Sequence, residues 1–242
     1  MNIYLKKIDY IIYGFLSYVE VSIYAYILYW HIGIALVVGI CGILLLKSRL
    51  QRLINKRKEK TLALFGQFLE SLGAMTKAGR SVENSIELVY QDFRENYNGK
   101  GVFINKFGDL VSAMHSGLTL KVSMEEFCVG LEIEEVRDFS NGFKIVFGKA
   151  ANLDHLIHVS QCIIRDKIDT KIEVDALLSG KRYEIKIMKI MPFVLIVMLN
   201  CLVPEYMMPN YTTLLGRVVM SIAGMVIFIS SYLSNQIGKV MF

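Results

Sequence analysis

The feature that most constrains the fold is an apolar stretch, residues 10–46, in which Glu20 carries the only formal charge. As one straight helix at ~1.5 Å per residue it would be ~55 Å long, whereas the hydrocarbon core of a bilayer is ~30 Å thick. Aromatic residues, a histidine and a glycine interrupt the stretch at residues 29–33. It therefore predicts a transmembrane hairpin whose two spans are residues 10–28 and 32–46.

An alternative reading of the N-terminus has a single span. Residues 1–22 would then form a helix in the membrane interface, with one span after it. Its polar face would hold Asp9, Tyr13, Ser17 and Glu20.

A second apolar pair closes the sequence, at residues 187–203 and 218–235, and we expect Pro204 and Pro209 to mark the turn between them. The whole chain is 54% apolar, which exceeds the 45–50% apolar content typical of soluble domains. Its mean hydropathy is +0.43. The sequence thus predicts a multi-pass membrane protein with four spans.

The basic residues predict the orientation of these spans. Seven of them lie in residues 47–60, and neither short loop, 29–33 or 204–213, has a Lys or Arg. Because Lys and Arg near span ends stay in the cytoplasm, both termini and residues 47–186 should be cytoplasmic. Arg217 is the one exception, and its side chain can reach the outer interface.

Charge divides the cytoplasmic part unevenly. Residues 47–60 carry a net charge of +6, and residues 61–180 a net charge of −5. The basic segment should attract anionic membrane lipid, at ~1 kcal/mol per basic residue. A nucleic-acid-binding protein would spread its basic residues over the folded domain, so no nucleic acid is expected as a partner.

Between residues 47 and 186 apolar residues recur at spacings of three and four, which is typical of helices. We expect Gly79 and Gly117 to end helices with a positive φ, each followed by a hydroxyl residue that caps the next helix. Gly148 with Asn152 makes a looser third corner. These corners predict six helices, at residues 48–77, 82–97, 102–115, 120–130, 132–147, and from 153 into the third span. The predicted fold class is all-α, with a cytoplasmic six-helix bundle between two transmembrane hairpins.

Several short motifs occur in order from about residue 56 to the end of the chain. They are Phe68-Leu69-Glu70-Ser71-Leu72, Ala78-Gly79-Arg80-Ser81, Asp166-Lys167-Ile168, Glu173, Ala176-Leu177, Ile187-Met188-Lys189-Ile190-Met191-Pro192, Pro204-Glu205-Tyr206 and Leu215-Gly216. With this order and spacing the chain resembles the type II secretion F-domain proteins, and among them the TadB-like inner-membrane platform proteins of tight-adherence pili. It departs from them at Gly148-Lys149-Ala150-Ala151, where the family usually has paired glycines.

The resemblance implies an F domain at residues 61–186, preceded by a basic juxtamembrane segment at 47–60 and flanked by transmembrane hairpins at 1–46 and 187–242. It also implies a platform protein of the cell membrane that couples a cytoplasmic secretion ATPase to the export of pilin or another substrate. The implied partners are that ATPase, a second F-domain paralogue (TadC-like) and pilin subunits, in a homo- or hetero-oligomer.

Two charged clusters are candidate partner contacts. Glu132, Glu134 and Glu135 belong to an acidic stretch that would suit a basic partner, although a merely solvated face is an equally good reading. The basic cluster Lys56, Arg57 and Lys58 has two interpretations. It sets the orientation of the spans in the membrane, or it contacts the secretion ATPase.

Two polar residues lie within apolar runs. Glu20 is costly in lipid, so we expect it to hydrogen-bond within the protein, to Asn200 or to a tyrosine, more readily than to line an ion path. Asn200 is interpreted in the same way. A transport permease is the alternative function, but it would require more polar groups at mid-membrane.

His155, His158 and Cys162, beside Asp154, have a spacing that could hold zinc on one helical face, but no second ligand cluster closes the site. The sequence also has no phosphate-binding loop and no Ser-His-Asp pattern. We therefore expect no metal, no cofactor and no enzymatic activity.

Overall fold

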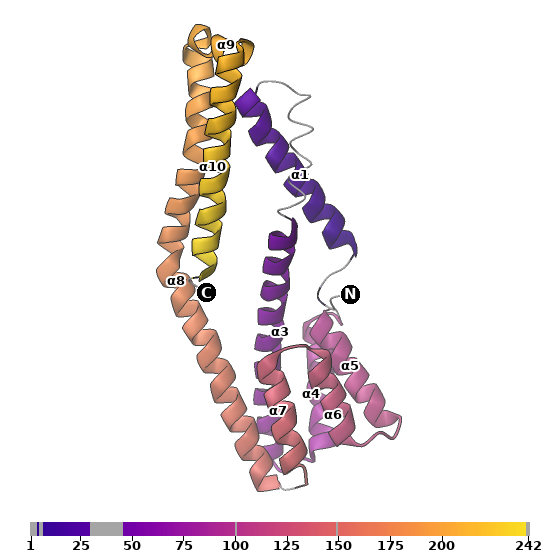
Figure 1. The fold of residues 1–242 in the computed structure, drawn as a ribbon. Helices are drawn as coiled ribbons and strands as arrows, with labels where there is room; N and C mark the ends of the chain where they lie inside the picture. The colour runs from indigo at the N-terminus through magenta and orange to yellow at the C-terminus, as the bar shows by residue number, and fades with distance from the viewer. Residues whose placement is uncertain (1–3, 5–6, 30–45, 100, 149, 241–242) are drawn as a thin grey trace. The chain divides into compact units, whose positions relative to one another are not determined.

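The computed structural model describes residues 4, 7–29, 46–99, 101–148 and 150–240 (Figure 1). All regular secondary structure in these ranges is helical, which confirms the all-α prediction at this level. The chain forms two compact units: unit 1 is Met1–Leu5 with Arg52–Glu173, and unit 2 is Lys6–Gln51 with Val174–Phe242.

Six helices of the described residues contribute to unit 1. They are α3 (Leu46–Lys77), α4 (Val82–Asn96), α5 (Val102–His115), α6 (Leu120–Gly130), α7 (Glu134–Val146) and α8 (Ala150–Leu202). The helix α7 begins two residues later than predicted because Glu132 has a φ of 52°, which is not helical. The helix α8 begins before Asn152, so the prediction that Asn152 caps it is wrong.

The predicted glycine corners are present, with φ values of 84° at Gly79, 87° at Gly117 and 90° at Gly148. After α3, the amide of Gly79 donates to the carbonyl of Thr76 at 2.9 Å, and that of Arg80 to the carbonyl of Met75 at 3.2 Å. This hydrogen-bond pair is a Schellman motif, which requires a left-handed residue and therefore favours glycine. Ser81 then caps the start of helix α4, because its hydroxyl accepts from the amide of Asn84 at 3.4 Å.

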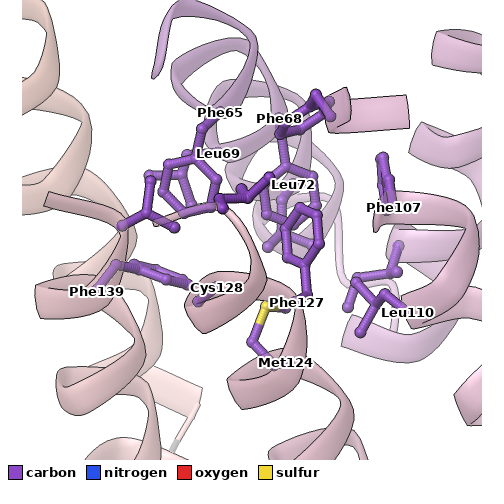
Figure 2. Close-up of a cluster of buried hydrophobic side chains, with 14 of the residues drawn as sticks. Phe65, Phe68, Leu69, Leu72, Phe107, Leu110, Met124, Phe127, Cys128 and Phe139 are labelled. Atoms are coloured by element: carbon purple, nitrogen blue, oxygen red, sulfur yellow. The ribbon is translucent and has the colours of Figure 1, made fainter. Parts of the chain in front are cut away.

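One hydrophobic core fills unit 1, and α3 supplies its centre (Figure 2). Phe65, Phe68, Leu69 and Leu72 repeat at spacings of three and four on α3 and are fully buried. The ring of Phe68 packs edge-to-face against Phe107 of α5, with ring centroids 5.1 Å apart. Aromatic pairs of this geometry are worth ~0.5–1.5 kcal/mol beyond the area that they bury.

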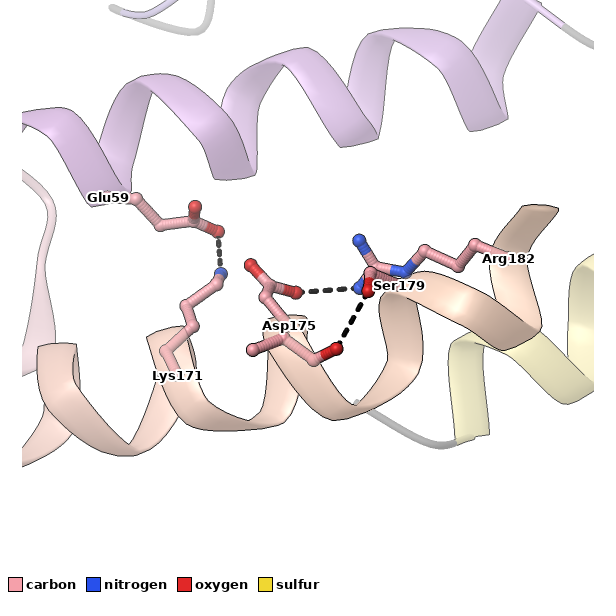
Figure 3. Close-up of polar contacts among 6 residues, drawn as sticks. Glu59, Lys171, Asp175, Ser179 and Arg182 are labelled. Atoms are coloured by element: carbon pink, nitrogen blue, oxygen red, sulfur yellow. Dashed lines mark hydrogen bonds and ion pairs between the residues drawn. The ribbon is translucent and has the colours of Figure 1, made fainter.

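Helices α3 and α8 pack antiparallel in a seven-residue register within unit 1. A Cβ added to Gly66 would lie 3.2 Å from Ile164, and one added to Gly73 would lie 3.1 Å from Ile157. One heptad before Gly66 in α3, Glu59 pairs with Lys171 (Figure 3). These contacts repeat every seven residues, and the two glycines let isoleucines of α8 approach the backbone of α3.

In unit 2, helix α1 (Lys7–Tyr29) turns its polar face inward. Asp9 is 7% exposed and Ser17 is fully buried, whereas Ile11 and Phe15 are 71% and 69% exposed. Water-facing helices show the opposite pattern, because their apolar stripe faces the core. The apolar face of α1 therefore has the character of a lipid-facing surface.

Two helices in the described ranges are long and apolar enough to cross a membrane, at Ile8–Ile27 and within Asn152–Leu202. The helices α9 (Pro204–Thr212) and α10 (Leu214–Val240), bent by 96° at their junction, make a third candidate if they are counted as one span. A membrane protein is consistent with these helices. Residues 32–45 of the predicted span 32–46 lie outside the described residues.

The segment predicted as a proline-marked turn is the helix α9 instead. Pro204 stands at its first position, where the absent N–H costs no helical hydrogen bond. The amide of Gly216 donates to the hydroxyl of Thr213 at 3.1 Å and so caps α10. The guanidinium of Arg217 donates to the carbonyl of Tyr211 at 3.0 Å, near the negative end of α9. Arg217, the one basic residue that is an exception to the predicted orientation, therefore has a hydrogen-bond partner close by in the sequence.

Candidate functional site

The acidic candidates lie at the corner between α6 and α7 and differ in their surroundings. The side chains of Glu132 and Glu134 are exposed. That of Glu135 is 15% exposed and forms an ion pair with Lys167 of α8. Two carboxylates of the predicted cluster are therefore open to a partner, whereas the third holds α7 to α8.

The basic cluster meets the same corner. The ammonium of Lys58 donates to the backbone carbonyl of Glu132 at 2.8 Å, across 74 residues of sequence. Lys56 is exposed, and Arg57 is partly buried. The structure thus brings together two charged clusters that are far apart in the sequence. We use the name α6–α7 corner site for Lys58, Leu131, Glu132 and Glu134.

The same site holds a residue that sequence reasoning missed. Tyr4 is 1% exposed, and its hydroxyl donates to the carbonyl of Leu131. The ammonium of Lys58 lies 5.6 Å from the centre of its ring, and the guanidinium of Arg57 donates to its backbone carbonyl. A lone tyrosine near the N-terminus gives no sequence signal for such a contact.

Burial changes the chemistry of this phenol. It raises the pKa of Tyr4 to about 12, and the nearby carboxylate of Glu132 adds to the rise, while a hydrogen bond with Thr61 opposes it. Tyr4 therefore remains a protonated hydrogen-bond donor at any physiological pH.

The intramembrane candidates both have partners in unit 2. Glu20 pairs with Arg49 of α3, where the sequence suggested Asn200 or a tyrosine. The amide of Asn200 donates to the hydroxyl of Tyr211 at 2.7 Å and to the carbonyl of Ile196 at 3.0 Å. Both polar groups are thus engaged within the protein.

The residues considered for zinc all lie on α8, and three of them have side-chain contacts. The hydroxyl of Thr76 donates to the carboxylate of Asp154 at 3.1 Å, and the sulfur of Cys162 lies 3.9 Å from Nδ1 of His158. Asp154 and His158 line a groove of about 260 Å³ between α3 and α8, together with Glu70, Gly73, Ala74, Lys77, Ile157 and Gln161. Among the residues that the structure describes, no three His, Cys, Asp or Glu side chains converge as a metal would require.

No protein-family model, curated protein or solved structure matches this chain.

Proposed function

We propose that the chain is the membrane platform protein of a type II secretion or Tad-type pilus assembly machine. In this role its helical module, unit 1, recruits a cytoplasmic secretion ATPase, and its membrane helices engage pilin subunits or another exported substrate. A TadC-like F-domain paralogue would complete the platform. The chain itself would be mechanical rather than catalytic, with the ATPase as the source of energy.

The observation that carries the proposal is the helix α8. It spans 53 residues, and its first part packs into the core of unit 1 through Ile157 and Ile164. Its last part presents exposed apolar side chains, such as Met188 and Leu195, which suit lipid. The residues of α8 therefore belong in part to the helical module and in part to a segment that is apolar enough to cross a membrane.

Ion pairs and tight packing hold α8 to the module. Lys167 pairs with Glu135 of α7, and Lys171, one helical turn later, pairs with Glu59 of α3. Gly66 and Gly73 admit isoleucines of α8 at close range. These contacts hold the first part of α8 to the rest of the module, as a mechanical coupling would require.

The proposed topology has four spans, with both termini and unit 1 in the cytoplasm. The burial of Tyr4 against Leu131 in unit 1 supports it, because the N-terminus and the module must then lie on the same side. The segment between Tyr4 and α3 would cross the membrane an even number of times. An interfacial helix followed by a single span would separate Tyr4 from Leu131, so the hairpin is the better reading.

The contacts of Glu20 and Asn200 weigh against a permease. A transport path needs polar groups that are open to a substrate at mid-membrane. Glu20 is paired with Arg49, and Asn200 with Tyr211, so the two candidates are already engaged.

Charge reversal at the α6–α7 corner site tests the docking step. The double variant Glu132→Lys/Glu134→Lys should weaken co-purification of the ATPase encoded nearby. Raised salt should weaken the wild-type interaction, because salt screens exposed charges over ~8–10 Å. Glu135 is left unchanged because its reversal would break an internal ion pair. Glu95→Lys, an exposed carboxylate of α4, is the matched control.

The two variants should melt at similar temperatures, because exposed substitutions usually cost under ~0.5 kcal/mol. Normal ATPase recruitment by the double variant would reject this corner as the docking surface. Equal loss in the Glu95→Lys control would show a general charge effect instead.

A further inference from the structure

We infer that residues 204–217, here named the α9–α10 junction, lie in the interface of one membrane leaflet and bind lipid through their exposed side chains. The segment between the third and fourth predicted spans is then an interfacial helix held against α8 and α10, and not a loop in water. This placement concerns the lipid alone and depends neither on a secretion ATPase nor on pilin.

The direction of α9 relative to α10 is the first observation. The two helices are bent by 96° at their break (Figure 1), so α9 runs close to the membrane plane when α10 crosses the bilayer. Backbone contact fixes this angle. A Cβ on Gly216 would lie 2.5 Å from Cα of Asn210 and 2.6 Å from the carbonyl oxygen of Pro209. The first turn of α10 therefore packs directly on the end of α9.

The exposed side chains of the junction are large and apolar. Tyr206 and Met208 of α9, with Leu214 and Leu215 of α10, are 66–80% exposed. This surface continues along α10, a segment whose composition suits a membrane, where the exposed apolar residues are Val218, Val219, Ile222, Met225 and Val226. Lipid covers a continuous apolar surface of this kind without the cost that water would impose.

The hydroxyl groups of the junction bond to its own backbone. The hydroxyl of Thr212 donates to the carbonyl of Met208 at 3.0 Å, and that of Thr213 donates to the carbonyl of Pro209 at 2.6 Å. A hydroxyl in water does not require such a partner, whereas in lipid each polar group must find one within the protein. Both threonines are therefore suited to a surface with little water.

Asn210 and Tyr211 follow the same pattern. The amide of Asn210 donates to the sulfur of Met207 at 3.7 Å, and the hydroxyl of Tyr211 accepts from the amide of Asn200 in α8 at 2.7 Å. Glu205, in the first turn of α9, is the one formal charge in residues 190–216. A carboxylate is costly at the bilayer centre but not at the headgroup level, where it meets water. The junction therefore fits the interface better than the hydrocarbon centre.

Tryptophan fluorescence of the full-length protein in phosphatidylcholine vesicles tests this placement. Trp30 is the only tryptophan of the chain, so a Trp30→Phe background allows one tryptophan to be introduced at a time. Tyr206→Trp and Leu215→Trp replace exposed side chains, which usually costs under ~0.5 kcal/mol. Lipid brominated near the headgroup should quench both, and iodide on both sides of the membrane should quench them weakly.

Two control variants calibrate the quenching. Ile145→Trp replaces a residue of α7 in unit 1 that is 78% exposed, and iodide rather than brominated lipid should quench it. Brominated lipid should quench the junction variants at least twice as strongly as Ile145→Trp. Val226→Trp lies about three turns further along α10, so bromines near the ends of the lipid chains should quench it best.

Circular dichroism checks that each variant keeps its helix content, and either junction position is sufficient for the decision. Iodide quenching at the level of Ile145→Trp would place the junction in water and overturn the inference. Strongest quenching by bromines near the chain ends, as expected for Val226→Trp, would place it at the bilayer centre and overturn the interfacial position. Quenching by neither agent would show that a second copy covers the junction, which would overturn lipid binding.

Discussion

The guanidinium of Arg49 donates a hydrogen bond to the carboxylate of Glu20, which ties the middle of α1 to the first turn of α3 within unit 2. A lone carboxylate in an apolar helix is costly in lipid, and a cationic partner reduces this cost. The residue that the sequence suggested as an intramembrane polar site therefore has a structural role.

A double-mutant cycle tests this pair. Glu20→Gln and Arg49→Gln should each lower the melting temperature, and the two effects should not add, with a coupling free energy of ~0.5–3 kcal/mol. The exchanged variant Glu20→Arg/Arg49→Glu should recover part of the loss. Purely additive losses would show that the pair contributes no stability.

The glycine corners give a second prediction. At Gly79 and Gly117 nothing lies within 4 Å of an added Cβ, so the cost of a side chain there comes from the backbone conformation alone. Gly79→Val and Gly117→Val should each destabilise the protein by ~1 kcal/mol or more.

Gly180 provides the control for these corners, because it lies within α8 with equal space around it. Gly180→Ala should be neutral or stabilising by up to ~1 kcal/mol, since alanine favours a helix. Circular dichroism melts of the full chain can compare all three variants. Unchanged melting of both valine variants would contradict the role of these glycines.

The seam between α3 and α8 gives a third prediction. Gly73→Ala should destabilise unit 1 because the new Cβ would lie 3.1 Å from Cγ2 of Ile157. Ile157→Leu removes that Cγ2 atom, so Gly73→Ala should cost less in the Ile157→Leu background than in the wild type. An equal cost in both backgrounds, measured by thermal melts, would mean that the seam tolerates the added methyl elsewhere.

Tyr4 gives a pH prediction. Its pKa rises from 10 in the unfolded chain to about 12 in the folded protein, so folding favours the protonated phenol. The resulting stabilisation is fully present below pH 10 and is lost as the pH rises through 12. The stability difference between wild type and Tyr4→Phe should shrink over this window. A constant difference across it would contradict the buried position of the phenol.

Much of the helical framework could be predicted from the sequence because its signals are local. Gly79 and Gly117 end helices through a backbone conformation that glycine adopts without strain, and the heptad-like spacing on α3 marks its buried face. The helix α9 was missed because Pro204 and Pro209 suggest a turn. A proline at the first helical position is nevertheless compatible with a helix.

The corner site could not be predicted, because its contacts join distant residues. Tyr4 and Leu131 are 127 positions apart, and Lys58 and Glu132 are 74 apart. Neither pair has a periodic pattern or a motif that would link its members. The register between α3 and α8 could be predicted only in part. Gly66 with Gly73, and Ile157 with Ile164, each show the seven-residue spacing in the sequence. That these two pairs face each other is seen only in the structure.

The most direct test of the platform role is a count of surface filaments after deletion of the gene. The account predicts that filaments disappear, that the full-length chain restores them, and that the ATPase leaves the membrane fraction in the deletion strain. Normal filament numbers together with normal membrane association of the ATPase in that strain would contradict it.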